Sequence, residues 1–403
     1  MPNVPRVRIV PWVPIGLTLM LTCCAGPPQS WAALQRHVSG LAEGEREAAI
    51  EQFIAAKGGT PIIENQTRLV FLAQDVNSVT PRVVGDFNGW ASTPQGYDAT
   101  VGTMTRIAGT SWSFLAGSAY TNARLEYVFL FDAEATPDPL NPRTVMANSG
   151  PRSEARMPFW VAQPEIDDES DVAAGLVLSD TIQSRSLRGP RRVWYYLPPG
   201  YDAEAETLYP VMYVLDGGNY IEKMDVPRVL DRLIARKAIQ PVVAVFSEPV
   251  ERQEEYSRDP KWRAFMTSEL VPLVDQRFRT FPAPSHRAIV GSSYGAYGAI
   301  DLAVEFPSIF GLSAAIAPPP QTASLITNQA HAQAAVVSIR FFVMGGVYDS
   351  MLDGARNLRT TLDDFDAPVS YLEVPEGHNT NTFRAHLDDA INALLADQQE
   401  AKR

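Results

Sequence analysis

The sequence predicts an α/β protein in which a β-sandwich precedes a doubly wound, mostly parallel sheet. From residue 192 onwards, apolar strands alternate with helical segments, as in sheets that carry helices on both faces. One strand, residues 288–290, runs into Gly291-Ser-Ser-Tyr-Gly295 and then into an alanine-rich helix. Short strands separated by turn residues between 65 and 161 predict the sandwich.

The composition is that of a globular protein with more than one domain, since 403 residues include 45% hydrophobic and 20% charged side chains. The formal net charge is −12, and no lysine-rich run occurs, so a nucleic acid is not an expected partner. Both cysteines, Cys23 and Cys24, lie near the N-terminus. We therefore expect no disulfide framework, no metal site and no cofactor. The oligomeric state is left open.

Residues 1–32 predict a signal peptide. Arginines at positions 6 and 8 precede an apolar stretch at 15–21, and Ser30-Trp-Ala32 offers small residues where a signal peptidase reads. The stretch is too short and too interrupted by proline to predict a membrane span. We expect cleavage after Ala32 and a periplasmic or secreted protein without a transmembrane segment. The alternative is a lipid anchor on Cys24, although Cys23 stands where a lipoprotein box normally has a small residue.

The rest of the chain divides into four parts by composition. We expect an N-terminal helical segment at 33–64, whose helix at 41–57 ends in two glycines, and a β-sandwich at 65–161. A polar, acidic linker at 162–174 then leads to the α/β domain at 175–403. All residues proposed below for catalysis lie in this last part, which predicts that it hydrolyses a small ester on its own.

Two motifs in the sandwich, Val84-Gly-Asp-Phe-Asn-Gly-Trp90 and Asp138-Pro-Leu-Asn-Pro142, resemble the early-set, immunoglobulin-like modules of glycogen-binding proteins. The resemblance implies that Trp90 matches the first of two tryptophans that stack on sugar. The second tryptophan is absent from residues 133–137, and Val128 stands where those modules usually have lysine. We therefore expect a structural role, docking onto the next domain, rather than sugar binding.

Ser293 is the predicted nucleophile, because a strand, a Gly-x-Ser-x-Gly turn and a helix together present a serine above a sheet edge. A serine hydroxyl needs a base and an acid that orients the base, and in such folds both follow the serine along the chain. His378 lies in a loop between a strand at 369–374 and the last helix, so it is the predicted base. Asp349, after the strand at 340–344, is the predicted acid, and Asp353 is the alternative.

Two main-chain amides are expected to bind the oxyanion. One is that of Tyr294, directly after the nucleophile, and the other is that of Gly218, in a glycine turn after the strand at 209–215. Arg252 is expected on the rim, where it would hold an anionic substrate or form an ion pair with Glu248 or Glu255. The ion pair is the favoured interpretation.

Four segments carry a further resemblance: Arg192-Val-Trp-Tyr-Tyr-Leu-Pro-Pro-Gly-Tyr201, Val214-Leu-Asp-Gly217, residues 291–295 and Glu376-Gly-His378. They are similar to the enterochelin-esterase-related family of α/β-hydrolases, whose relatives include feruloyl and acetyl esterases. The resemblance implies a Ser293, Asp349 and His378 triad and an exported carboxylic-ester hydrolase with an acyl-enzyme intermediate.

The substrate is expected to be an acetyl or hydroxycinnamoyl sugar ester, as a small molecule or linked to a polysaccharide. Acidic residues on the predicted rim disfavour the alternative, a strongly anionic siderophore trilactone. Two alternative functions stay open: an acyltransferase and a non-catalytic binding protein with the same fold.

Overall fold

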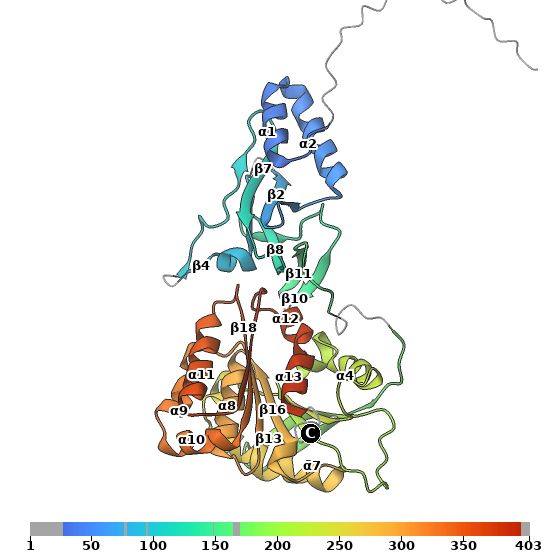
Figure 1. Ribbon diagram of the computed structural model, residues 1–403, viewed down its shortest axis with the longest axis vertical. Helices are drawn as coiled ribbons and strands as arrows, with labels where there is room; N and C mark the ends of the chain where they lie inside the picture. Colours follow the sequence, from blue (N-terminus) through green and yellow to red (C-terminus); the bar gives the residue numbers. More distant parts are fainter. Residues whose placement is uncertain (1–26, 76–78, 94–95, 148, 164–169, 396–403) are drawn as a thin grey trace, which may run out of the picture.

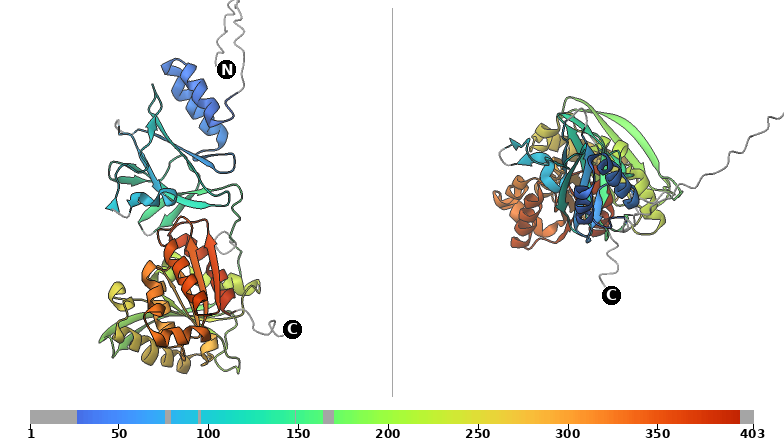
Figure 2. Two further views of the ribbon diagram at one scale, coloured as in Figure 1. Left: turned by 60° about the vertical axis from the view of Figure 1, so that its left-hand side comes forward. Right: turned by 90° about the horizontal axis from the view of Figure 1, so that it is seen from above.

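The computed structural model describes residues 27–75, 79–93, 96–147, 149–163 and 170–395. The chain forms an elongated molecule in which a smaller front part of helices and strands stands on a larger α/β part (Figures 1 and 2). Most of the predicted signal peptide at 1–32, with Cys23 and Cys24, lies outside the described residues. Within these residues, no helix has both the length and the apolar character needed to cross a membrane.

Two helices open the front part, α1 (Trp31–Gly40) and α2 (Glu43–Lys57). Helix α2 matches the expected helix and ends at Gly58 in a left-handed conformation. Most of helix α1 falls in the expected helical segment at 33–64, but it begins at Trp31, inside the predicted signal peptide. The Ser30 side chain caps it, and Trp31 is only 1% exposed and packs on Phe114. Cleavage after Ala32 would remove both the cap and this buried indole.

The front part contains two sheets that pack face to face. The first has the order β1 (Ile62–Glu64), β2 (Arg68–Gln74), β7 (Trp112–Ser118) and β6 (Thr105–Arg106). The second has the order β10 (Thr144–Ala147), β11 (Gly150–Arg156), β8 (Arg124–Phe131) and β3 (Arg82–Gly85), and β9 (Glu134–Thr136) pairs with β8. A short helical turn at Asp86–Ala91 leads to a ribbon of β4 (Ser92–Thr93) and β5 (Gly96–Tyr97).

The core between these sheets includes Phe71 of β2 and Tyr127 of β8, whose ring centroids lie 4.9 Å apart. The predicted β-sandwich is therefore present. The hairpin of β10 and β11 was missed, because its few apolar residues do not alternate regularly with polar ones along either strand.

The α/β part is built on one sheet with the order β12 (Leu176–Ser184), β13 (Gly189–Leu197), β15 (Val243–Ser247), β14 (Val211–Leu215), β16 (Arg287–Ser292), β17 (Leu312–Ile316), β18 (Arg340–Gly346) and β19 (Val369–Val374). The strands from β15 to β19 in this order are parallel, whereas β12 and β13 at one edge are antiparallel. The expected doubly wound, mostly parallel sheet is confirmed.

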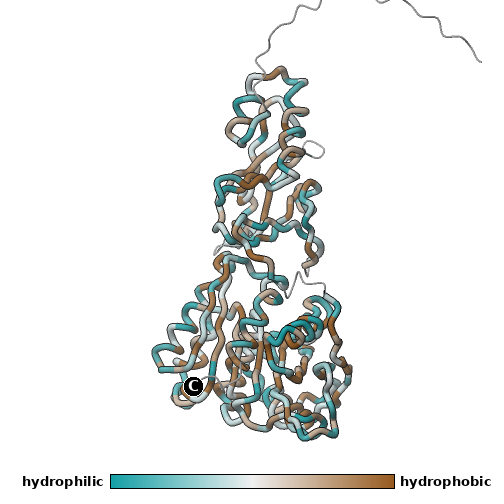
Figure 3. Tube along the Cα trace, turned by 45° about the vertical axis from the view of Figure 1, so that its right-hand side comes forward, coloured by the Kyte–Doolittle hydropathy of each residue, from teal (hydrophilic) through white to brown (hydrophobic). Residues whose placement is uncertain are grey.

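Helices cover both faces of this sheet, and hydrophobic stretches run through its interior (Figures 1 and 3). One face packs against Val274, Ile300 and Leu358, and the other packs against Leu230 and Leu394. These residues lie on α7 (Val271–Arg277), α8 (Tyr294–Glu305), α11 (Leu352–Asp364), α4 (Val226–Ala235) and α13 (Leu387–Leu395) respectively. Shorter helices are α5 (Arg252–Tyr256), α6 (Pro260–Ala264), α9 (Ser324–Thr327), α10 (Ala330–Ala335) and α12 (Thr380–Ala385).

Candidate active site

Ser293 lies in a sharp turn between β16 and α8. Its backbone has φ 55° and ψ −127°, a combination that costs a non-glycine residue about 1–3 kcal/mol. The flanking glycines are required by packing, since a Cβ on Gly291 would overlap the carbonyl of Gly295, and a Cβ on Gly295 would lie 2.8 Å from Oδ2 of Asp216. The serine amide donates to the Ile316 carbonyl at 2.8 Å, which fixes the turn over β17. Ser293 itself is partly exposed.

His378 and Asp349 meet through a direct hydrogen bond. Nδ1 of His378 lies 2.7 Å from Oδ2 of Asp349, and Oδ1 of the same carboxylate accepts the Met351 N–H at 2.8 Å. The Asp349 side chain is 1% exposed, whereas that of His378 is 31% exposed. A buried carboxylate with both oxygens engaged thus holds an imidazole that faces the solvent, which is the arrangement of an oriented general base.

The three residues lie at the same end of the sheet, where the parallel strands finish. Ser293, Asp349 and His378 follow β16, β18 and β19, which are parallel, so all three leave the sheet at its carboxyl end. Asp353, the alternative acid, is exposed in the first turn of α11. The other histidines that follow Ser293 are placed elsewhere: His331 contacts Glu305 at 3.1 Å, and His386 lies buried between α12 and α13.

The two expected oxyanion donors differ in their surroundings. Tyr294 is the first residue of α8, so its amide belongs to the N-terminal turn, where main-chain N–H groups and the helix dipole favour negative charge. The amide of Gly218 instead donates to Oε2 of Glu248 at 2.5 Å. Burial raises the pKa of Glu248, and the nearby charge of Asp216 adds to this effect. Gly218 could serve an oxyanion only after the Glu248 carboxyl turns away.

Arg252 forms an ion pair, but with a different partner from the two expected. Its guanidinium donates to both oxygens of Asp216, at 2.6 and 2.7 Å. Glu255 pairs with Arg191 at 3.2 Å instead, and Glu248 accepts the Gly218 amide. The two predicted partners are therefore wrong, since each of these carboxylates has a different partner in the structure.

The contact of Asp216 with the Ser293 turn was not predicted from the sequence. It is buried, it has a positive φ of 60°, and its amide donates to the Tyr256 hydroxyl at 3.0 Å. Its carboxylate lies between Arg252 and Gly295, directly under the Ser293 turn. The sequence feature that could have predicted this position is Asp216-Gly-Gly at the end of a strand, because aspartate tolerates the left-handed backbone of such a turn.

Trp90 and the Asp138 motif of the front part are engaged in internal contacts. The guanidinium of Arg152 lies 4.1 Å from the centroid of the Trp90 ring, and the indole N–H donates to Oδ1 of Asp86 at 2.9 Å. Asp138 accepts hydrogen bonds from Thr60 and from Tyr127, both at 2.7 Å. These contacts favour the structural role expected for both motifs.

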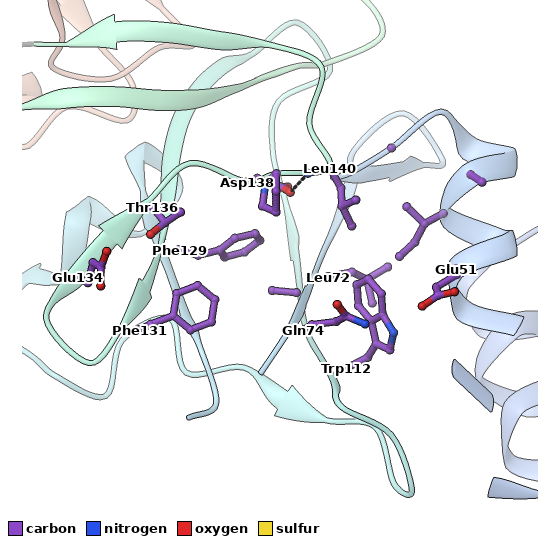
Figure 4. A pocket seen from close by; sticks show the side chains of 15 residues that line it. Glu51, Leu72, Gln74, Trp112, Phe129, Phe131, Glu134, Thr136, Asp138 and Leu140 are labelled. Carbon is purple, nitrogen blue, oxygen red and sulfur yellow. Dashed lines mark hydrogen bonds between the residues drawn. The ribbon is translucent and has the colours of Figure 1, made fainter. Parts of the chain in front are cut away.

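A separate apolar cavity of about 630 Å³ lies at one end of the sandwich. Figure 4 shows Phe129 and Phe131 facing Leu72 and Trp112 across it, with α2 at its edge. It includes none of the residues predicted for catalysis. Among the described residues, no cluster of three or more His, Cys, Asp or Glu side chains could hold a metal ion.

The fold is that of the α/β-hydrolases, and comparisons with known proteins agree. The family model described as "putative esterase" matches residues 184–394, and the chain belongs to this family. Among curated proteins, the iron(III) enterobactin esterase of Dickeya dadantii is 26% identical over 306 residues, covering 64% of this chain and 68% of that protein. An esterase of Mycobacterium tuberculosis is 24% identical over 288 residues, covering 53% of this chain and 61% of that protein.

Solved structures extend the likeness to the front part. The ferric enterobactin esterase of Salmonella typhimurium superposes with a TM-score of 0.70 and 21% identity, covering 85% of this chain and 98% of its own. A ferulic acid esterase has a TM-score of 0.51 and 21% identity, and covers 56% of this chain and 98% of its own. At these identities the likeness shows the fold. The chain spans 59% to 61% of the length of the first curated relatives it matches, from Bacillus subtilis and M. tuberculosis.

Proposed function

We propose that this protein is a serine carboxylic-ester hydrolase with Ser293, His378 and Asp349 as its catalytic residues. The observation that carries the proposal is the His378–Asp349 hydrogen bond at the same sheet edge as the Ser293 turn. With Nδ1 committed to Asp349, the second ring nitrogen, Nε2, is left to take the Ser293 proton. Membership of the esterase family supports the same chemistry.

In the proposed reaction, Oγ of Ser293 forms a bond to the ester carbonyl carbon while its proton moves to Nε2 of His378. The tetrahedral intermediate collapses by breaking the bond to the alcohol oxygen, which leaves with the proton held by His378. A water molecule then attacks the acyl-enzyme, with His378 as base, and releases the acid and free Ser293. The Tyr294 amide stabilises the oxyanion in both halves.

Two substrate classes have separate support. Arg252 is committed to Asp216, so the cation placed on the rim does not serve an anionic substrate, which favours a neutral acetyl or hydroxycinnamoyl sugar ester. The solved enterobactin esterases, however, cover the front part as well as the α/β part, whereas the ferulic acid esterase covers 56% of the chain. A siderophore trilactone is therefore the second candidate.

The test is a comparison of kcat/KM for the purified protein on a catecholate trilactone and on feruloyl and acetyl sugar esters. The sugar-ester proposal expects the sugar ester to be the better substrate, and a hundredfold preference for the trilactone would replace it by the second candidate. The same assay with an added alcohol acceptor separates hydrolysis from acyl transfer, because a transferase yields a new ester instead of the free acid.

We also propose that the protein is exported from the cytoplasm. Because Ser30 caps α1 and Trp31 is buried, a cut on the N-terminal side of Ser30 fits the fold better than one after Ala32. The mass of the protein recovered from the cell envelope or medium tests this. A mass that starts at Ala33 would show that α1 is cut in spite of its packing, and recovery only from the cytoplasm would contradict export.

A further inference from the structure

The loop that carries His378 lies between the two parts of the molecule. Helix α12 and the loops after β18 and β19 stand at the end of the α/β part that faces the sandwich (Figure 1). The contact between the two parts begins at Pro375, one residue after β19 ends at Val374, and reaches into α12. The front sandwich is therefore in a position to determine where the imidazole points.

Arg124, the first residue of β8 in the sandwich, makes the central contact. Its guanidinium donates to Oε2 of Glu376 through Nε at 3.1 Å and through Nη2 at 2.5 Å, and its amide donates to the Pro375 carbonyl at 3.3 Å. Nη1 is 3.2 Å from Glu154 within the sandwich, and Nη2 also reaches Thr382 of α12 at 3.3 Å. Arg124 thus links one β-strand of the sandwich to residues on both sides of His378.

This contact is buried. Arg124 and Glu154 are 2% exposed, and the Glu376 side chain is 3% exposed. Burial alone would raise the pKa of Glu376, but His386 and Arg124 lower it to about 2, so the carboxylate is charged at neutral pH. A buried charge that loses one partner either moves towards another or draws in water. Losing Arg124 would therefore displace the Glu376 segment.

A second contact fixes the residue next to the histidine. Gly377 packs so closely on Asp86 of the sandwich that a Cβ at this position would overlap the Asp86 carboxyl group. The Asp86 carboxyl is itself held by the amide of Glu126 at 2.7 Å and by the Trp90 indole. In α12, the side-chain amide of Asn381 donates to Oε1 of Glu126 at 2.8 Å.

The loop of the predicted acid is held in the same way. The hydroxyl of Tyr348, the neighbour of Asp349, accepts the amide of Tyr120 from the sandwich at 2.9 Å. The Tyr348 amide in turn donates to the Glu376 carbonyl at 3.1 Å. The acid and base loops therefore share a support that consists partly of the front sandwich.

We propose that Arg124 is a positioning residue that holds the His378 loop, through Glu376, in the orientation that ester hydrolysis requires. The front sandwich then acts as part of the catalytic framework, even though it supplies no reacting group. This inference rests on the proposed function, because it assumes that His378 is the base. The inference predicts that removing the two hydrogen bonds from the Arg124 guanidinium to Glu376, called the Arg124 fork, lowers kcat. KM for a small ester should change little, since a small ester does not reach the buried fork.

The experiment compares Arg124→Met and Arg124→Lys with matched changes at Arg82. Arg82 is a good control because it lies on the neighbouring strand β3 and binds the carbonyls of Asp98 and Val101 inside the sandwich. The full-length proteins are assayed with 4-nitrophenyl acetate, and their folding is checked by near-UV circular dichroism and thermal unfolding. We expect at least a tenfold loss of kcat for Arg124→Met and a three- to tenfold loss for Arg124→Lys, with KM within twofold. Both Arg82 variants should keep kcat within twofold.

A spectroscopic measurement separates positioning from loss of stability. The low-field proton resonance of the His378–Asp349 hydrogen bond should broaden or shift in Arg124→Met and stay unchanged in Arg82→Met. If Arg124→Met does not fold, the kcat of Arg124→Lys tests the positioning role instead, because lysine keeps the buried charge and loses only the fork. Unchanged kcat in a folded Arg124 variant, or equal losses at Arg82, would overturn the inference. Wild-type activity in Ser293→Ala would instead overturn the proposed function, so the two failures are distinguishable.

Discussion

The Asp349 carboxylate accepts a hydrogen bond from Nδ1 of His378 at 2.7 Å, across 29 positions of the sequence. Because Met351 holds the other carboxylate oxygen, the acid has a single orientation towards the imidazole. This geometry fixes which ring nitrogen carries the proton and which is left for Ser293, the proposed nucleophile.

Asp349→Asn should lower kcat by about 10³- to 10⁴-fold, because an amide in place of the carboxylate favours the wrong tautomer of His378. Asp353→Asn is the matched control, since Asp353 is exposed on α11 and should keep kcat within about twofold. Steady-state kinetics on an activated ester decide. If Asp353→Asn is the damaging change and Asp349→Asn is mild, the acid is Asp353.

Gly377→Ala should lower both thermal stability and kcat. The new methyl group would overlap the Asp86 carboxyl group, and overpacking of this kind costs typically about 1–3 kcal/mol. Gly117→Ala is the control, because a Cβ on Gly117 meets nothing within 4 Å. The melting temperature and kcat are measured for both. Equally small changes in melting temperature and kcat for the two variants would show that the sandwich does not pack tightly against the His378 loop.

Stability should fall as the pH rises from about 6.5 to above 9, and His386 should be a cause. Burial alone would lower the pKa of His386, but Asp389 and Glu376 raise it to about 9. A folded-state pKa above the ordinary 6.5 means that the stabilisation is complete below 6.5 and is lost through about 9, on the order of 3 kcal/mol. Denaturant unfolding at several pH values should show a flatter profile for His386→Gln. Identical slopes in the two proteins would contradict this assignment.

The front sandwich should not bind glycogen or amylose. Arg152 covers one face of Trp90, the ring also packs against Val84, Ala91 and Val128, and its indole N–H is used by Asp86, so the ring is not free for stacking on a sugar. Affinity electrophoresis in amylose gels measures the retardation of the native protein. Clear retardation that disappears in Trp90→Ala would mean that the ring is available after all.

The local parts of the site could be predicted from the sequence because each depends on neighbouring residues. The Ser293 turn needs Gly291 and Gly295 within two positions, and Asp349 and His378 each follow an apolar strand. The start of helix α1 was missed because Ser30-Trp-Ala32 has the composition of a signal-peptide cleavage site. Its burial depends on the first sheet of the sandwich, which the sequence does not place against it.

Long-range ion pairs could not be predicted in this way. Arg124 and Glu376 are 252 positions apart, and nothing near either residue specifies the other. Arg252 likewise meets Asp216, across 36 positions, and not the nearby acids. If Arg124 positions the His378 loop as proposed, the α/β domain alone should hydrolyse a small ester more slowly than the full-length protein.

The central claim is that Ser293 is the nucleophile, and Ser293→Ala tests it most directly. Hydrolysis of an activated ester and covalent labelling by a fluorophosphonate, followed by intact mass, are measured for the wild type and for the folded variant. We expect one label on the wild type, mapped to Ser293, no label on Ser293→Ala, and a loss of kcat by several orders of magnitude. Undiminished hydrolysis by Ser293→Ala, or labelling at another serine, would contradict it.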